Sequence, residues 1–524
     1  MSDTNQVAAA EAELHRLAGL VEAARRSGNH DAEIDALARI AVIRRADPNA
    51  HAALGGALAA AERYEEAINP FRWAVKLDPQ NAAYSFALGN ALKYAGRFDE
   101  ALECYRRAVA LQPDEVQVIE GLGVALAEAS RTEEAVEAFR QALAVDAKAT
   151  GVHFNLGIAF VTLERFAEAR AEFEACLALD PVHPDAEFNL GMVALSEGNA
   201  DEALDHFKRA TAFQQELRRR FDTNETIMPF RLLHEHQQAE YLAARGLLPA
   251  GREPWRAALA ELWQRHKDRP RTEGIHLTKE ERERLGPSFH EVVYDGGPCP
   301  RLPTVINPNL DLPAIEETYF GVKPEVVVID DLLTPEALAA LRKFCLEATV
   351  FKKSFTPGYL NSLLYDGFAT PLVLQLTEEL RTRLPRIFRP HRLHLAWGIK
   401  YDSTLRGIPL HADFAAVNVN FWITPDEANL DPASGGLILW DKESPPDWPF
   451  IEYNQAGPRV RKFLKDSGAK AIRVPYRANR AVVFNSALFH ETDAIRFRDA
   501  YEDRRINITL LYGRKLRVSN TAGF

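Results

Sequence analysis

Residues 54–71 read LGGALAAAERYEEAINPF, and four positions of this stretch recur every 34 residues through the N-terminal half of the chain. They are Leu54, Gly55, Ala67 and Phe71. Because a fixed period of about 20–50 residues is the sign of stacked structural units, the stretch predicts an array of equivalent helical repeats. The matching positions, in the same order, are Leu88, Gly89, Ala101 and Tyr105; Leu122, Gly123, Ala135 and Phe139; Leu156, Gly157, Ala169 and Phe173; and Leu190, Gly191, Ala203 and Phe207.

Each repeat is predicted to be a pair of antiparallel helices. The small residues let the two helices approach closely, and the aromatic residue fills the gap between successive pairs. Proline ends the second helix at Pro79, Pro113 and Pro181, because its nitrogen cannot donate the helical hydrogen bond. Period and pattern together resemble the tetratricopeptide repeat. The resemblance implies an all-α superhelix over residues 1–217, with a degenerate capping repeat at about 6–47 and five repeats over 48–217.

Two roles are open for this array. It is either a scaffold or assembly surface, or a concave groove that binds a peptide or protein segment. Asn155 and Asn189 each lie two residues before a repeat glycine. In peptide-binding arrays of this family an asparagine at that place often binds the ligand backbone, so the resemblance makes both residues substrate-binding candidates. The alternative is that they are ordinary polar residues on a helix surface.

The overall composition limits the class of protein. The 524 residues carry a formal charge of -11, which argues against a nucleic-acid partner. The four cysteines have no C-x-x-C spacing, as expected for reduced thiols in a cytoplasmic protein. The polar first residues predict no signal peptide, and no run of apolar residues is long enough to predict a membrane partner. The expected location is therefore the cytoplasm, and the oligomeric state stays open.

Residues 218–320 are predicted to connect the array to a second domain. The segment is helical to about residue 265 and then rich in proline and glycine, with little regular structure expected. His234 and His236 lie two residues apart, which does not place both on one helix face, so a structural role is expected for them.

From residue 321 the chain changes to short β-rich runs separated by turn residues. A helix start at Thr334-Pro335 follows the first of these runs. This pattern predicts a β-sandwich or jelly roll with helices packed outside it. The expected strands are 326–329, 394–401, 416–424, 436–440, 471–474, 481–485 and 506–512.

Three polar features of this second region form one constellation. His411 and Asp413 are two residues apart, so their side chains share one side of an extended chain. His490 follows the apolar run 482–485, and Arg504-Arg505 opens the last expected strand. Two histidines and one carboxylate on one face of a metal leave open positions, which is the facial triad of non-haem iron(II) oxygenases. An arginine nearby suits the distal carboxylate of a bound oxo acid.

The order of these features resembles the 2-oxoglutarate oxygenase superfamily and, within it, the prolyl-4-hydroxylase-like group. The resemblance implies a double-stranded β-helix (jelly-roll) domain over residues 321–524, with Fe(II) bound by His411, Asp413 and His490 and with 2-oxoglutarate and O₂ as co-substrates. It implies that Arg505, rather than Arg504, binds the 2-oxoglutarate carboxylate. Tyr401 matches a tyrosine that reaches the co-substrate in prolyl hydroxylases.

Asn418, Asn420 and Trp422 share one face of the strand after the metal motif. Asn420 and Trp422 are therefore candidates for lining the co-substrate pocket, because asparagine side chains inside a barrel need hydrogen-bonding partners. The alternative is that this face meets solvent.

The resemblance implies an enzyme that hydroxylates a residue, with proline the first candidate, of a peptide recruited by the repeats, releasing succinate and CO₂. One departure is that Arg505 follows His490 by 15 positions, where relatives usually have about ten. Two alternatives stay open. One is the same chemistry on a small molecule such as a free amino acid or natural-product intermediate, and the other is a catalytically silent binding protein.

Overall fold

The structure is a computed structural model that describes residues 2–221, 226–286, 291–356, 358–446, 448, 450–454 and 457–513. Its chain divides into two compact units, one ending at Leu179 and the other beginning at Asp180. We call the first the repeat unit and the second the sheet unit. Among the described helices, none combines the length and the apolar character that crossing a bilayer requires.

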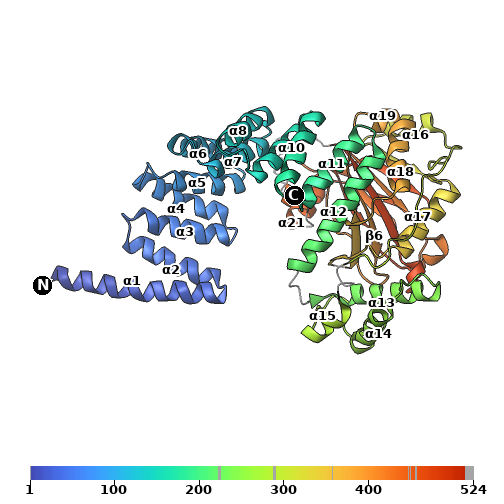
Figure 1. The fold of residues 1–524 in the computed structure, drawn as a ribbon, viewed down its shortest axis with the longest axis horizontal. Coiled ribbons are helices and arrows are strands. Elements are labelled where there is room, and N and C mark those ends of the chain that lie inside the picture. Colours follow the sequence, from blue (N-terminus) through green and yellow to red (C-terminus); the bar gives the residue numbers. More distant parts are fainter. Residues whose placement is uncertain are drawn as a thin grey trace. The chain divides into compact units, whose positions relative to one another are not determined.

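The repeat unit is a stack of antiparallel helix pairs (Figure 1). The first pair is longer than the others, and its sequence has lost the repeat pattern. The helices are α1 (Ser2–Ser27), α2 (His30–Ile43), α3 (Pro48–Ala60), α4 (Tyr64–Leu77), α5 (Ala82–Tyr94), α6 (Phe98–Leu111), α7 (Val116–Glu128), α8 (Thr132–Val145), α9 (Thr150–Thr162) and α10 (Phe166–Leu179).

Within each repeat the glycine of the first helix lies directly against the aromatic ring of the second. A Cβ atom built on Gly55 would lie 2.9 Å from the ring of Phe71, and one built on Gly123 would lie 2.5 Å from the ring of Phe139. Phe71 and Phe139 are buried. The ring therefore packs between the two helices of its own repeat. The sequence had predicted that it packs between successive repeats.

The turn between the two helices of a repeat also follows the 34-residue period. Glu62, Ser130 and Glu164 have positive φ angles of 58°, 60° and 58°, and Gly96 has a φ of 77° at the equivalent position. Each residue reverses the chain in the left-handed conformation that commonly ends a helix.

The sheet unit begins with the last helix pair, α11 (Pro184–Ser196) and α12 (Ala200–Phe221). Leu195 and Phe207 of this pair belong to the same buried cluster as Phe344, Leu376 and Ile508 of the sheet unit. Figure 1 shows both helices beside the sheet. The expected boundary at residue 217 therefore differs from the observed division, because the fifth repeat packs on the sheet and shares its core.

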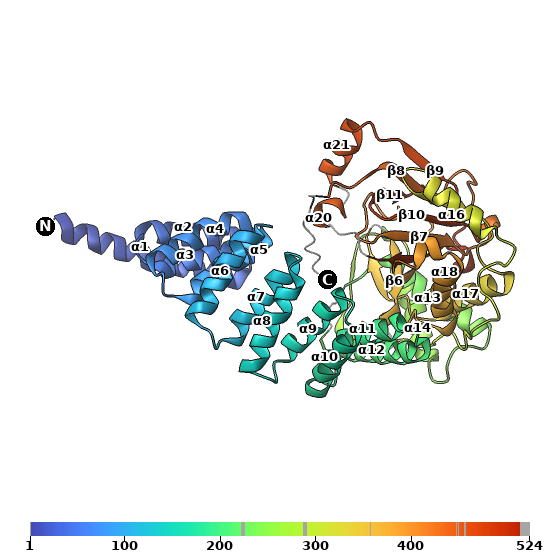
Figure 2. The same ribbon diagram turned by 90° about the horizontal axis from the view of Figure 1, so that it is seen from above.

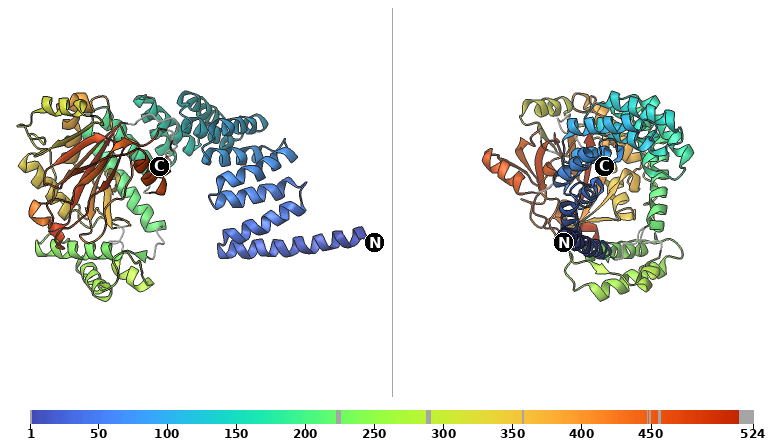
Figure 3. Two further views of the ribbon diagram at one scale, coloured as in Figure 1. Left: turned by 180° about the vertical axis from the view of Figure 1, so that it is seen from behind. Right: turned by 90° about the vertical axis from the view of Figure 1, so that its left-hand side faces the viewer.

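The connecting segment contains more regular structure than its composition predicts. Three of its helices, α13, α14 and α15, lie together at one end of the sheet unit, whereas α16 lies at the other end beside α19 (Figure 1); Figure 3 shows the same arrangement from behind. The elements of the segment are β1 (Thr226–Ile227), α13 (Pro229–Ala244), α14 (Glu253–His266), β2 (Ile275–His276), α15 (Lys279–Leu285) and α16 (Leu312–Gly321).

Two antiparallel sheets form the centre of this unit. The larger has the order β3-β10-β7-β12-β6-β5-β4, and the smaller has the order β11-β8-β9. Their strands are β3 (Val326–Ile329), β4 (Lys353–Phe355), β5 (Tyr359–Leu363), β6 (Leu393–Tyr401), β7 (Val417–Trp422), β8 (Leu437–Glu443), β9 (Ala471–Val474), β10 (Ala481–Asn485), β11 (Leu488–Thr492) and β12 (Ile506–Tyr512). The predicted β-rich region is confirmed, and its sheets are antiparallel. The strands β4, β5 and β11 were not predicted, and residues 514–524 of the predicted domain lie outside the described residues.

The larger sheet is covered on both faces. On one side Trp422 and Phe484 pack against Leu437 and Leu439 of the smaller sheet. On the other side lie α17 (Pro335–Glu347), α18 (Pro371–Arg383) and α19 (Pro385–Phe388). Figure 2 shows the smaller sheet on one side of the larger and α17 and α18 on the other. The described part of the unit also contains α20 (Phe450–Tyr453) and α21 (Pro458–Asp466), between β8 and β9.

We expect the adjacent substitutions Gly55→Ala and Gly56→Ala to act in opposite directions. The first adds a methyl group against the ring of Phe71 and should destabilise the chain by about 1–3 kcal/mol. The second adds one where nothing lies within 4 Å and should stabilise the helix by about 0.5–1 kcal/mol. Chemical denaturation of the two variants checks this, and equal shifts would contradict the packing described.

We also expect truncation before Asp180 and truncation before residue 218 to differ. The longer piece keeps α11 and α12 in the core, whereas the shorter piece loses Leu195 and Phe207, at about 2–5 kcal/mol for each large buried side chain. The longer piece should unfold cooperatively on heating and the shorter should not. Equal thermal transitions in the two pieces would contradict a shared core.

Candidate metal centre

His411 and His490 are joined through their backbones. The amide of His411 donates to the carbonyl of His490 at 2.9 Å, and the amide of His490 donates back at 2.7 Å. His490 lies on β11, whereas His411 lies in the segment between β6 and β7. This reciprocal pair brings the two imidazole rings to 4.2 Å between centroids.

Both histidines are oriented in the same way. Nδ1 of His411 lies 2.8 Å from the carbonyl of Pro409, and Nδ1 of His490 lies 2.9 Å from the carbonyl of Leu488. Since a carbonyl only accepts, each Nδ1 carries a proton, and in the neutral form of the ring Nε2 then keeps its lone pair. The two Nε2 atoms lie 3.8 Å and 3.5 Å from the carboxylate oxygens of Asp413. One ligand atom from each of the three residues lies within 4.8 Å of the others.

Neighbouring backbone fixes the segment that carries His411 and Asp413. The amide of Ala412 donates to the carbonyl of Tyr453 at 2.8 Å, and the side-chain amide of Asn454 donates to the carbonyl of Ala412 at 3.0 Å. The amide of Asp413 donates to the carbonyl of Ser486 at 3.0 Å. Ala412 is buried in an apolar cluster, so the two polar side chains beside it share the opposite side.

The protonation states suit a divalent cation. Burial, with the neighbouring His490 adding to it, lowers the pKa of His411 to about 4, so this imidazole is neutral near pH 7. Burial by itself raises the pKa of Asp413, but its interactions with His490, His411 and Asn418 outweigh burial and lower this pKa overall. Neutral imidazole nitrogens and an ionised carboxylate are the forms that bind a metal. The donor set therefore fits a transition-metal ion with further coordination positions left open.

Arg505 is a buried cation at the start of β12, with 1% of its surface exposed. Its Nε donates to the carbonyl of Gly435 at 2.6 Å and its Nη2 to that of Gly436 at 3.2 Å. Its Nη1 has no hydrogen-bond partner among the described residues. Burying a guanidinium without a carboxylate partner is costly, so the arrangement favours an anionic ligand.

Aromatic rings surround this guanidinium. Its Cζ lies 4.5 Å from the ring centroid of Tyr401 and 5.6 Å from that of Trp422. The hydroxyl of Tyr401 lies 3.5 Å from the hydroxyl of Thr492. Trp422 is fully buried, and its indole nitrogen has no partner within the described part of the chain.

The two arginines at the start of β12 face different ways. Arg504 donates from Nη2 to the side-chain oxygen of Gln237 on α13, at 2.7 Å. Arg505 alone shares the side of Tyr401 and Trp422, because adjacent residues of a strand point to opposite faces.

The solvent-facing alternative for Asn418, Asn420 and Trp422 is wrong, because all three are buried. Asn420 does line the inner face of the larger sheet, but its side chain bonds to Asn418, Asn507 and Thr509. The anchoring of Ala412 by Tyr453 and Asn454 was missed, because hydrogen bonds between residues 41 and 42 positions apart leave no local sequence signal.

Asn155 and Asn189 belong to different units and use their amide groups within the chain. Asn155 donates to the carboxylate of Glu120 at 2.9 Å, and Asn189 donates to the carbonyl of Asp185 on its own helix at 2.8 Å. His234 is fully buried, with its Nε2 3.3 Å from Nζ of Lys400, and it is not part of the metal cluster.

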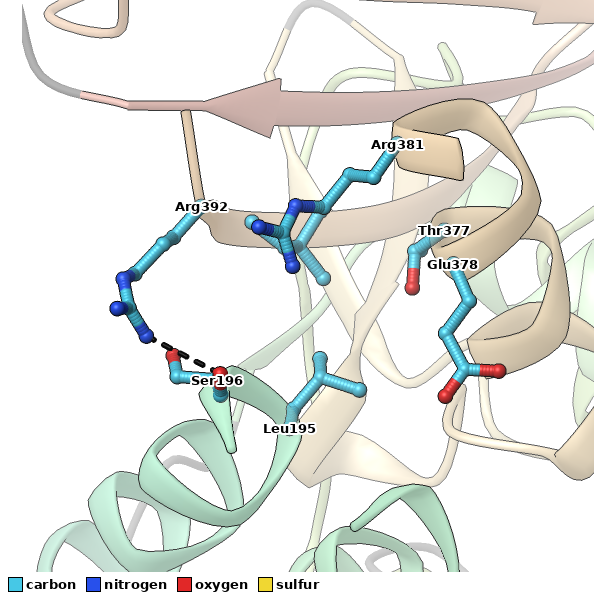
Figure 4. A pocket seen from close by; sticks show the side chains of 7 residues that line it. Leu195, Ser196, Thr377, Glu378, Arg381 and Arg392 are labelled. Carbon is cyan, nitrogen blue, oxygen red and sulfur yellow. Dashed lines mark hydrogen bonds between the residues drawn. The ribbon is translucent and has the colours of Figure 1, made fainter. Parts of the chain in front are cut away.

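A small pocket elsewhere in the sheet unit contains no residue of the metal cluster (Figure 4). Beside this pocket, Nη1 of Arg392 donates a hydrogen bond to the carbonyl of Ser196, the last residue of α11, at 3.1 Å. Its lining consists of Leu195, Ser196, Thr377, Glu378, Arg381, Arg392 and Leu393.

The family model that matches this chain covers the repeats. Residues 52–92, 86–151 and 154–216 match the family model of the tetratricopeptide repeat, so this part of the chain consists of such repeats. No curated protein matches the chain.

Three solved structures show how limited the structural similarity is. YrrB, described as a TPR protein with an unusual peptide-binding site, is 21% identical with a TM-score of 0.30, covering 34% of this chain and 93% of that one. MamA from Desulfovibrio magneticus is 23% identical with a TM-score of 0.31, covering 32% and 96%. PilF of Pseudomonas aeruginosa is 18% identical with a TM-score of 0.32, covering 41% and 95%. TM-scores this low support no statement about function.

We expect the metal-free protein to bind one Co(II) or Fe(II) ion, and single changes of His411, Asp413 or His490 to alanine to abolish this binding. Each variant removes one of the three converging ligand atoms. The exposed His276 provides the control, because His276→Ala leaves the cluster intact. Anaerobic calorimetric titration measures the affinity. Unchanged binding in any of the three cluster variants would contradict a metal centre at this place.

Proposed function

We propose that this protein is an Fe(II)- and 2-oxoglutarate-dependent oxygenase whose two facing sheets are a double-stranded β-helix. The observation that carries the proposal is the convergence of His411, Asp413 and His490, with both imidazoles held at Nδ1 by backbone carbonyls, together with the buried guanidinium of Arg505. A metal with two histidines and one carboxylate keeps positions for a bidentate oxo acid and O₂.

Each part of the site has a distinct task in this proposal. His411, Asp413 and His490 hold the iron, and the carbonyls of Pro409 and Leu488 keep both imidazoles in the tautomer that presents Nε2. Bound iron with 2-oxoglutarate and O₂ supplies an oxidant that hydroxylates an unactivated C–H bond, with release of succinate and CO₂. The buried apolar cluster of Trp422 and Phe484 lies beside this site, with the ring of Phe484 5.0 Å from that of His490, and would limit the access of water.

Arg505 is the proposed anchor of the 2-oxoglutarate C5 carboxylate. Two of its nitrogens are fixed by the carbonyls of Gly435 and Gly436, which orients the guanidinium and leaves Nη1 for the ligand. A carboxylate there neutralises the buried charge. Tyr401 and Trp422 fix the plane of the guanidinium from the sides.

The tetratricopeptide repeats are proposed to recruit a peptide or protein segment, one residue of which, proline being the first candidate, is hydroxylated. A second binding surface on the same chain raises the local concentration of a tethered target. The competing proposal keeps the chemistry on a small molecule, and the repeats then serve assembly alone.

The first test is turnover of 2-oxoglutarate to succinate with anaerobically loaded Fe(II). The wild type should form succinate, Asp413→Ala should form none, and Arg505→Met should raise the KM for 2-oxoglutarate at least about 30-fold, since losing one partner of a buried charge pair costs about 2 kcal/mol or more. Arg504→Met is the matched control, because the Arg504 side chain faces α13, and its KM should stay near the wild-type value.

The outcomes separate the proposals. No succinate from the wild type, with no binding of iron or 2-oxoglutarate, favours a silent binding protein. Succinate formation that increases with free amino acids but not with peptides favours the small-molecule substrate.

A further inference from the structure

Four buried polar side chains connect Asp413 to β12, the strand that begins directly after Arg505. Asn418 and Asn420 lie on β7, and Asn507 and Thr509 lie on β12. The two strands are neighbours in the larger sheet, where Asn420 is paired with Thr509. The exposed fractions of the four side chains lie between 0% and 6%, so they need partners within the protein.

The partners form one continuous chain of hydrogen bonds. Nδ2 of Asn418 donates to Oδ2 of Asp413 at 2.8 Å, and Nδ2 of Asn420 donates to Oδ1 of Asn418 at 2.6 Å. Oδ1 of Asn420 accepts from Nδ2 of Asn507 and from the hydroxyl of Thr509, both at 2.8 Å. Nδ2 of Asn507 also donates to Oγ1 of Thr509 at 2.9 Å.

The donors and acceptors in this series of hydrogen bonds follow a fixed order. A side-chain amide has one accepting oxygen and one donating nitrogen, so satisfying one end fixes what the other end presents. Two donors from β12 meet the oxygen of Asn420, which turns its NH₂ group towards Asn418. The oxygen of Asn418 then accepts, and its NH₂ group faces the carboxylate of Asp413. A flipped Asn418 would instead bring its oxygen against a carboxylate oxygen, which repels it.

We propose that these four residues are a hydrogen-bond relay in which Thr509 and Asn507 set the orientation of Asn418, and Asn418 sets the carboxylate plane of Asp413 for the metal. Asn418 and Thr509 are thus positioning residues of the metal centre. Oδ2 of Asp413 is engaged by Asn418, whereas Oδ1 accepts no hydrogen bond from the described residues. Because the relay runs from β7 to β12, the orientation of Asp413 depends on both of these neighbouring strands.

The relay assigns Asn420 a different task from the co-substrate contact that its sequence position suggests. Its oxygen already accepts two hydrogen bonds and its nitrogen donates one within the protein. Asn420 transmits orientation from one strand to the next, and the co-substrate meets Arg505, Tyr401 and Trp422 instead. This inference rests on the proposed function, since it concerns the same metal centre.

Titration of the metal-free full-length protein with Co(II) tests the relay, with calorimetry for affinity and the visible absorption of Co(II) for ligand geometry. Asn418→Leu should weaken binding about 10–100-fold, the usual effect of losing a group that orients a metal ligand. Thr509→Val, which removes only the distant hydroxyl, should weaken binding by a smaller factor and change the absorption spectrum. Thr509→Ser, which keeps the hydroxyl, should restore both.

Thr377→Val is the matched control. Thr377 is equally buried but lies on α18, where its hydroxyl donates to the carbonyl of Leu374 on the same helix. It should bind Co(II) as the wild type does, even if its thermal stability falls. Wild-type affinity in Asn418→Leu, or in Thr509→Val should the former not fold, overturns the relay. Failure of the wild-type protein to bind any metal overturns the proposed function itself, so the two failures are distinguishable.

Discussion

The reciprocal backbone hydrogen bonds between His411 and His490 are the interaction on which the candidate site depends. They join the segment before β7, a strand of the larger sheet, to β11 of the smaller sheet, at the place where both histidines present Nε2. A carbonyl two residues earlier fixes each ring. The three ligand atoms therefore converge because the backbone is paired there. None of the three ligands is a long side chain with many rotamers. Such prior ordering reduces the conformational entropy lost on binding a metal.

The two buried charges of the site, the carboxylate of Asp413 and the guanidinium of Arg505, differ in how well the protein neutralises them. The carboxylate of Asp413 accepts a hydrogen bond from the side-chain amide of Asn418, which stabilises its charge in the folded protein. The guanidinium of Arg505 meets two carbonyls and two aromatic rings but no carboxylate of the described residues. This arrangement favours the binding of an anion beside the guanidinium, because the anion offsets the cost of the buried positive charge.

The repeats depend on a simpler constraint, which is close packing without a side chain. A Cβ atom built on Gly55, Gly123, Gly157 or Gly191 would lie 2.5–2.9 Å from an aromatic ring, and one built on Gly89 would lie 3.2 Å from the ring of Tyr105. Small and large residues therefore alternate across each helix pair, and the 34-residue period is the spacing of these contacts. The last pair uses its outer surface for a second purpose, since Leu195 and Phe207 also belong to the core of the sheet unit.

The sequence alone determined the repeats, the β-rich second region and the order of the residues His411, Asp413, His490 and Arg505. These patterns are local or periodic, so composition and spacing reveal them. Only the tertiary structure decided that the fifth repeat packs on the sheet and that Asn420 bonds to its neighbours. It likewise showed that the side chains of Arg504 and Arg505 have different partners, Gln237 for the first and the carbonyls of Gly435 and Gly436 for the second. These facts depend on which surfaces meet and on how strands far apart in the chain are paired, and such contacts are set by burial and hydrogen-bond satisfaction across the whole fold.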